Sequence, residues 1–207
     1  MTITNGYIDL ATLKADLIIK PSDPVDDTRL ERIIEAVSRA IDKDRKRRFY
    51  TTTSDETRYF TAEFGHRCVI ADLLTLTTLK TDLDGDGTYE TTWASTDYNL
   101  FPYNATLNDE PYLAIEKAIF GVNFFPTHLK GVQVVGKFGY CTLTNITTAA
   151  PGIREAALLM CQRVRQRKDL IFGIAGNAEL GTLQAIDKLM RDGEIQFLLN
   201  SVARRRL

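Results

Sequence analysis

The stretch Leu-Glu-Arg-Ile-Ile-Glu-Ala-Val-Ser-Arg-Ala-Ile at residues 30–41 decides the fold that we expect for this chain. Its apolar side chains recur every three or four residues, the spacing that puts them on one face of an α-helix. That face consists of Leu30, Ile33, Ile34, Val37, Ala40 and Ile41. After the prolines at positions 21 and 24, Asp26 or Asp27 can cap this helix. The pattern predicts a long amphipathic helix at the centre of a helical core.

Two shorter patterns add helices to this core. Asp9 precedes leucines at positions 10, 13 and 17, which predicts a capped short helix. Pro151 is favoured in the first turn of a helix, and an apolar face follows it up to about Lys168. That face consists of Ile153, Ala156, Ala157, Met160 and Val164. Residues 1–50 and 150–168 are therefore expected to form a small helical bundle.

The middle of the chain, residues 51–149, has a different composition. Threonine, tyrosine, phenylalanine and valine alternate there with turn residues, a texture that favours short strands. The expected strands are Thr57 to Phe64, Val69 to Asp72, Leu74 to Lys80, Tyr89 to Trp93, Tyr98 to Phe101, Leu113 to Ala118 and Val132 to Tyr140. The predicted fold class is α+β, a small helical bundle with a β-rich, barrel-like or sandwich-like insertion.

The C-terminal part, residues 169–207, is expected to form an extended arm. Its first portion, up to Gly181, contains three glycines and predicts a flexible loop or a poorly anchored arm. A break at Asp192 and Gly193 precedes a short apolar helix and a basic end. The apolar residues are Ile195, Leu198, Leu199 and Val202, and the basic end is Arg204, Arg205 and Arg206.

Charge is balanced over the chain as a whole but not locally. The 207 residues include 27 acidic and 26 basic side chains, so the formal net charge is -1 and no global field would hold a polyanion. A basic cluster nevertheless follows the central helix. It consists of Lys43, Arg45, Lys46, Arg47 and Arg48. Either the cluster is a solvated helix end, or it is a basic surface that lies near DNA or an acidic partner.

No pattern of catalytic or cofactor-binding residues emerges. Asp82, Asp84 and Asp86 match the opening of a calcium loop, but Trp93 stands where that loop needs a glutamate. A tight hairpin turn is the favoured interpretation, and the three aspartates are only weak metal candidates. Free, buried thiols are expected at Cys68, Cys141 and Cys161. We expect neither a cofactor nor enzymatic activity.

The sequence also lacks the marks of a membrane protein or an exported one. No apolar run approaches the ~20 residues of a transmembrane helix, and the first residues do not have the pattern of a signal peptide. We therefore expect a protein that is made in a cytoplasm-like compartment and has no membrane partner.

Taken in order, several motifs resemble the head-tail connector (adaptor) proteins of long-tailed bacteriophages. The first are Ile-Asp-Leu-Ala-Thr-Leu-Lys at 8–14 and Asp-Asp-Thr-Arg-Leu at 26–30, which leads into the central helix. Next come Asp-Gly-Asp-Gly-Thr-Tyr-Glu at 84–90 and Val-Gln-Val-Val-Gly-Lys-Phe-Gly-Tyr at 132–140. The last, Pro-Gly-Ile-Arg-Glu-Ala-Ala at 151–157, opens the late helix. The resemblance thus runs nearly from end to end, although the tail after Asp169 is longer than in compact members.

This resemblance implies a structural virion protein at the head-tail interface, assembled in the host cytoplasm. Its copies would form a dodecameric ring between the portal protein and a tail-side stopper. Packaged double-stranded DNA would pass through the channel without sequence-specific contacts. The resemblance further implies that the C-terminal segment docks on the portal, and the candidate docking residues are Ile195, Leu198, Leu199, Val202, Arg204, Arg205 and Arg206.

Three alternatives stay open at this point. Within the same class, the chain could be a head-completion stopper or a tail-terminator ring protein. From another class, the aspartate turn and the aromatic strands could belong to a calcium-binding or carbohydrate-binding β-module. The basic cluster could also belong to an intracellular regulator that binds nucleic acid.

Overall fold

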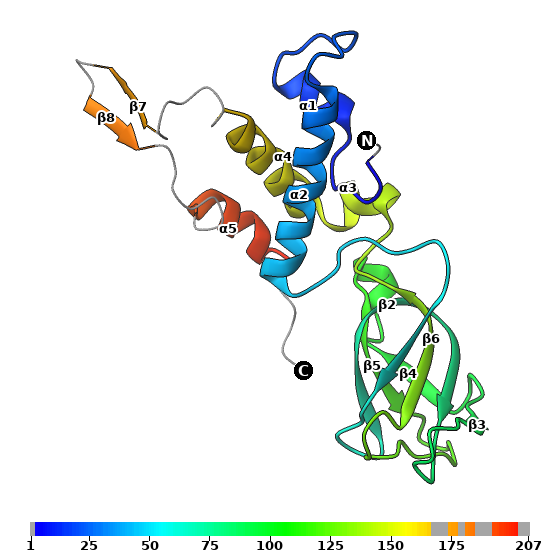
Figure 1. The fold of residues 1–207 in the computed structure, drawn as a ribbon. Coiled ribbons are helices and arrows are strands. Elements are labelled where there is room, and N and C mark those ends of the chain that lie inside the picture. Colours follow the sequence, from blue (N-terminus) through cyan, green and yellow to red (C-terminus); the bar gives the residue numbers. More distant parts are fainter. Residues whose placement is uncertain (1–2, 167–173, 178–180, 185–191, 203–207) are drawn as a thin grey trace. The chain divides into compact units, whose positions relative to one another are not determined.

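The computed structural model describes residues 3–166, 174–177, 181–184 and 192–202, and it divides into two compact units (Figure 1). The helical unit comprises Met1–Lys46 and Ile146–Arg205, and the β unit comprises Arg47–Asn145. We had expected these boundaries near residues 50 and 150. Helices and an antiparallel sheet together confirm the α+β class.

Among the described residues, the helical unit contains helices from both ends of the chain. They are α1 (Leu10–Asp16), α2 (Asp27–Arg45), α3 (Ile146–Ala149), α4 (Pro151–Gln166) and α5 (Gly193–Asn200). The Asp9 cap is confirmed, because its carboxylate accepts a hydrogen bond from the backbone N–H of Thr12 at 2.7 Å. Pro151 is the first residue of α4, as its preference for the first helical turn predicts.

The core of the helical unit lies between α2 and α4. Leu30, Ile34 and Ile41 of α2 are fully buried there, as is Ile153 of α4. Of the apolar face predicted for α2, only Ala40 is left half-exposed.

The N-terminus of α2 is tied to the end of α4 by an ion pair. Asp26 precedes α2 but makes no side-chain capping bond. Its carboxylate instead accepts a hydrogen bond from the Arg165 guanidinium at 2.8 Å. The two helices of the core are therefore linked by a charge pair as well as by apolar packing.

The β unit contains a six-stranded antiparallel sheet. Its strands are β1 (Glu56–Phe60), β2 (Arg67–Thr81), β3 (Thr91–Thr92), β4 (Tyr98–Phe101), β5 (Tyr112–Lys117) and β6 (Val132–Phe138). The order across the sheet is β1-β6-β2-β5-β4, and β3 pairs with the end of β2. Figure 1 shows that the sheet curls strongly, as a barrel-like insertion would.

The prediction of two strands at residues 69–80 was wrong, because β2 is a single strand of 15 residues. Asp72 lies within this strand, and its carboxylate is buried against Arg47. The register of β2 shifts between Val69 and Leu73 against β5 and twice further along against β6. Such shifts bend a strand, so β2 pairs with β5 along its first half and with β6 along its second.

Other strand ends differ by a few residues from the prediction, for local reasons. β1 ends at Phe60 and not at Phe64, and β3 keeps only two residues. β6 ends at Phe138, because Gly139 takes a φ of 148° and its N–H donates to the Asp72 carbonyl at 2.9 Å. The prediction for β4 matches its observed bounds.

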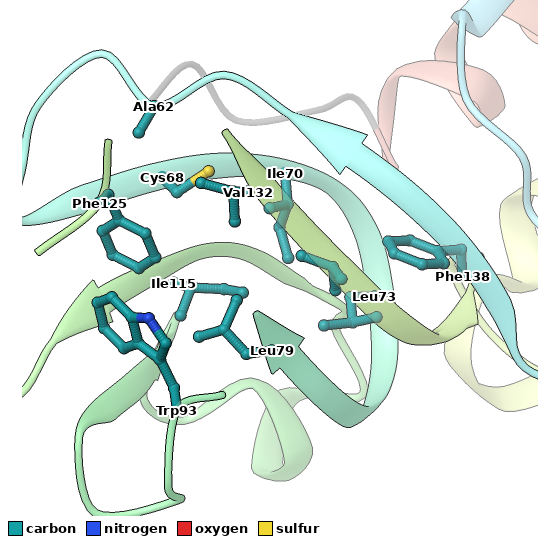
Figure 2. Close-up of a cluster of buried hydrophobic side chains, with 11 residues drawn as sticks. Ala62, Cys68, Ile70, Leu73, Leu79, Trp93, Ile115, Phe125, Val132 and Phe138 are labelled. Carbon is teal, nitrogen blue, oxygen red and sulfur yellow. The ribbon is translucent and has the colours of Figure 1, made fainter. Parts of the chain in front are cut away.

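The inside of the curled sheet is filled by apolar side chains from β2, β5 and β6 and from the adjoining loops (Figure 2). The indole of Trp93 stacks on the ring of Phe125, with 4.4 Å between the ring centroids. Its N–H donates to the hydroxyl of Thr81 at 3.0 Å, so the polar atom of this side chain is satisfied inside the core. The fold thus uses the only tryptophan of the chain as a core residue.

The glycine-rich segment that we expected to be a loop forms a hairpin in its described parts. β7 (Ile174–Asn177) pairs antiparallel with β8 (Gly181–Gln184). Glycine lowers strand propensity but does not prevent backbone pairing between two adjacent segments. The other residues of the predicted loop, 169–173 and 178–180, lie outside the described residues.

Gly136 is expected to be irreplaceable in the sheet. A Cβ at this position of β6 would collide with the backbone carbonyl oxygen of Thr75 in β2. Gly136→Ala should therefore lower the free energy of unfolding by about 1–3 kcal/mol, the usual cost of overpacking. The measurement is urea unfolding followed by Trp93 fluorescence. Gly65→Ala is the matched control, because a Cβ there meets only ordinary contacts at 3.7 Å or more. Equal stability of the two variants would contradict the prediction.

Candidate partner-binding surfaces

The arginines of the basic cluster contribute to the structure of the chain itself. Arg47 forms a buried ion pair with Asp72, with 2.5 Å between Nε and Oδ2, and the two side chains are 5% and 7% exposed. Its guanidinium also lies over the ring of Tyr140, 4.6 Å from the centroid. Arg48 pairs with Glu56 at 2.6 Å. These two arginines therefore hold the start of the β unit in place.

Arg45 has a similar role in the helical unit. Its guanidinium donates to the side chains of Gln196 at 2.6 Å and Asn200 at 2.9 Å, both on α5. A third hydrogen bond, at 2.8 Å, joins it to Asp44. Arg45 thus ties the C-terminal end of α2 to α5. With all three arginines engaged, only Lys43 and Lys46 of the predicted cluster are exposed.

The described acidic residues of α2 are already engaged, whereas several of its cations are not. Asp27 pairs with Lys14, Glu35 accepts hydrogen bonds from the backbone of residues 4 and 5, and Asp42 accepts one from Tyr7. Arg29, Arg32 and Lys43 on α2, and Lys46 directly after it, are the cations of this region that form no ion pair with a described residue.

The aliphatic residues predicted to dock on a partner are mostly buried in the chain's own helical unit. Ile195 and Leu199 are fully buried, and Val202 is 7% exposed. Gly152 in α4 lets the helices approach closely, because a Cβ there would come within 2.7 Å of the Leu198 carbonyl oxygen. Leu198 is half-buried, and Arg204, Arg205 and Arg206 lie outside the described residues. Portal docking by this set stays a prediction.

The three aspartates after β2 build a turn. Asp82 accepts hydrogen bonds from the backbone N–H groups of Gly85 at 2.7 Å and Gly87 at 2.9 Å. Burial would raise the pKa of this carboxyl, but these hydrogen bonds lower it below its ordinary value. Ligand oxygens of Asp82, Asp84 and Asp86 lie within 4.8 Å of one another. Because the turn already uses Asp82, metal binding here stays a weak prediction.

The cysteines are free and buried, as expected. Burial raises the pKa of the Cys68, Cys141 and Cys161 thiols to about 12. A thiol with such a pKa is almost fully protonated near neutral pH and is a poor nucleophile. None of the three is therefore suited to covalent catalysis.

An apolar groove runs between α2 and α4, which the sequence analysis did not anticipate. Its volume is about 640 Å³. Its lining residues, which we call the helix groove, are Arg29, Arg32, Ile33, Ala36, Val37, Ala40, Met160 and Val164. Arg32 and Ala36 are exposed, so the groove is open to solvent. Its floor is aliphatic, and the two arginines supply its charge.

A second apolar feature, also missed in the sequence, is the loop between β5 and β6. Its exposed side chains, together with a neighbouring phenylalanine, form what we call the apolar patch: Phe64, Ile119, Phe120, Val122 and Phe124. Phe120 is 95% exposed and Ile119 is 89% exposed. The run Ala-Ile-Phe-Gly-Val-Asn-Phe-Phe at residues 118–125 has neither helical nor strand periodicity, and this lack was the signal that could have revealed it.

Comparison with known proteins identifies the fold. A chain in the neck of an empty gene transfer agent (GTA) particle, computed with C6 symmetry, superposes with a TM-score of 0.59 at 16% identity. A chain in the neck of the native particle, computed with C12 symmetry, gives 0.57, and one in the native virion gives 0.56. Each match covers 100% of this chain and 94% of the other.

The chain therefore has the fold of neck proteins from phage-like particles, along its entire length. The predicted resemblance to head-tail connectors is confirmed at this level. No family model matches the chain, and no curated protein is similar to it. Within the described residues, no helix is long and apolar enough to cross a membrane.

Replacing Arg47 should lower the stability of the protein far more than replacing Lys46. Arg47→Gln leaves Asp72 buried without its charge partner, which should cost about 3–5 kcal/mol of stability. Lys46→Gln removes an exposed charge and should change stability by less than about 0.5 kcal/mol. Thermal and urea unfolding of both variants measure the difference. If Arg47→Gln were as stable as Lys46→Gln, the buried pair would have no structural role.

Proposed function

We propose that this chain is a structural subunit of the neck of a tailed phage or phage-like particle, a head-tail connector. The strongest support is that the structural matches cover the whole chain. Both units of the chain, in order and without remainder, match neck chains over 100% of this sequence. A shared domain alone would leave one unit unmatched. In this role the protein catalyses no reaction and acts in the virion after assembly in the host cytoplasm.

In the proposed assembly, the copies form a dodecameric ring between the portal and a tail-side stopper. The necks that contain the matching chains were computed with C6 and C12 symmetry, and both symmetries are compatible with twelve copies. A ring subunit needs only modest contacts, because many copies act together through their effective concentration.

The channel of such a ring would have to let DNA slide. The net charge of -1 suits this requirement, since a strongly basic subunit would hold the phosphate backbone. Lys43 and Lys46 are the members of the basic cluster that remain exposed. We assign to them the weak contact with DNA, or with an acidic partner, that the cluster was expected to make.

Portal docking is assigned to α5 and the residues that follow it. Ile195, Leu199 and Val202 anchor α5 on α4, so the helix is already folded before docking. The half-buried Leu198, together with Arg204, Arg205 and Arg206, is then left to meet the portal. A preformed helix loses less conformational entropy on binding than a disordered arm.

A stopper or tail-terminator subunit is the nearest alternative, and portal binding distinguishes it. We expect the purified protein to form a twelve-copy complex when mixed with its cognate portal, which native mass spectrometry would detect. An Arg204→Gln, Arg205→Gln, Arg206→Gln variant should bind the portal at least tenfold more weakly. A Lys20→Gln, Lys130→Gln variant is the control and should bind normally, because both lysines are exposed and lie outside the basic cluster. A small oligomer that ignores the portal would contradict the connector assignment.

The calcium- or carbohydrate-binding module is the alternative from another class, and the aspartate turn is its main support. Asp82 is engaged by two backbone N–H groups, so we expect no heat when calcium is titrated into the protein. Isothermal titration calorimetry makes this measurement, with Asp84→Asn as the comparison. A calcium signal that Asp84→Asn abolishes would favour the binding module.

A further inference from the structure

The apolar patch is a large apolar surface to leave in contact with water. Its five side chains are each between 58% and 95% exposed, and three of them are phenylalanines. Aromatic side chains bury about 150–250 Å² each, so the patch amounts to several hundred square ångströms. Monomeric soluble proteins rarely expose contiguous apolar patches of more than a few hundred square ångströms, and such patches commonly mark binding sites.

The loop that carries the patch is held in a defined shape. The backbone carbonyl of Asp97 accepts a hydrogen bond from Ala118 at 2.8 Å, and its carboxylate accepts one from Asn123 at 3.1 Å. Phe125 donates to the carbonyl of Gly65 at 2.9 Å. The loop backbone is thus hydrogen-bonded within the β unit, and the side chains of Ile119, Phe120 and Val122 stay more than 80% exposed. Phe124 lies under the ammonium group of Lys117, 3.7 Å from the ring centroid. Such a loop binds with little ordering cost.

The helix groove has complementary chemistry. Its floor is aliphatic, and its volume of about 640 Å³ is within the range that holds several large side chains. Arg29 and Arg32 line it without an ion pair among the described residues. A guanidinium attracts the face of an aromatic ring, and this chain already places Arg58 over Phe138 at 4.3 Å. The groove therefore suits a phenylalanine from outside.

We propose that the apolar patch of one copy inserts into the helix groove of the next copy, with Phe120 as the central side chain. This inference rests on the proposed ring. A patch and a groove in different places on one chain form a head-to-tail contact, which generates a closed ring when the rotation permits. A patch that paired with itself would instead give closed dimers and leave the groove empty. Each copy carries both halves of the proposed contact, so we assign a second copy of the chain as the partner that fills the groove.

The first test is a site-directed cross-link. Ala36→Cys places a thiol in the groove and Val122→Cys places one in the patch, while the native cysteines are buried. A short bis-maleimide, to which each thiol adds across one double bond, should convert the double variant into a ladder of multimers. Ala36→Cys combined with Leu107→Cys is the control, because Leu107 is 84% exposed outside the patch. An equal ladder in the control, or none in the test pair, would overturn the proposal.

The second test uses complementation. Phe120→Asp lacks the inserting side chain and Ala36→Arg blocks the groove, so neither variant should associate with itself in sedimentation velocity. Their mixture should form a one-to-one dimer, because one intact patch still meets one intact groove. Leu107→Asp is the control, since Leu107 is 84% exposed and lies outside the patch. If Leu107→Asp also lost self-association, or if the mixture formed no dimer, this contact would be ruled out.

The outcome of these two tests is independent of the outcome of the portal-binding test of the proposed function. If the portal assembles the ring but the cross-link does not form, the connector role stands and the contact is wrong. If no ring forms with the portal, the connector role fails, and the cross-link between concentrated isolated copies still decides the contact.

Discussion

Backbone pairing between the two ends of the β unit is the constraint on which the fold depends. The N–H of Tyr140 donates to the carbonyl of Arg48 at 3.0 Å, and that of Cys141 donates to the carbonyl of Phe49 at 3.2 Å. Because residues 47–145 are inserted between α2 and α3, this pairing brings the ends of the insertion together. α2 and α4, far apart in sequence, can then pack. The fully buried Phe49 and the Arg47–Asp72 pair stabilise the junction in low-dielectric surroundings.

The same junction explains why the role of the basic cluster could not be decided from the number of its charges. A run of cations after a helix has the same appearance whether its members face DNA, solvent or buried carboxylates. Here Arg45, Arg47 and Arg48 are committed to contacts within the chain. The positive charge that remains comes from lysines near the end of α2 and from arginines beside the helix groove. The positive surface charge that is left for partners is therefore modest.

The division of the chain into two units also bears on assembly. Each unit has its own core, so each can expose an apolar feature without losing stability: the helix groove in one and the apolar patch in the other. An isolated monomer gains nothing from such features, since apolar surface in water is unfavourable. They become useful when several copies meet, as in the ring that we propose.

The amino-acid sequence by itself determined the α+β class, α2 with its buried stripe, the Asp9 cap, the start of α4 and the bounds of β4. These features depend on local periodicity and capping, which short-range physics fixes. It could not show that β2 continues through Asp72, that three arginines turn inward, or that α5 packs on α4. Nor did it reveal the groove or the patch. Each of these depends on which distant residues meet, because only tertiary contact decides whether a charge is paired or an apolar side chain is covered.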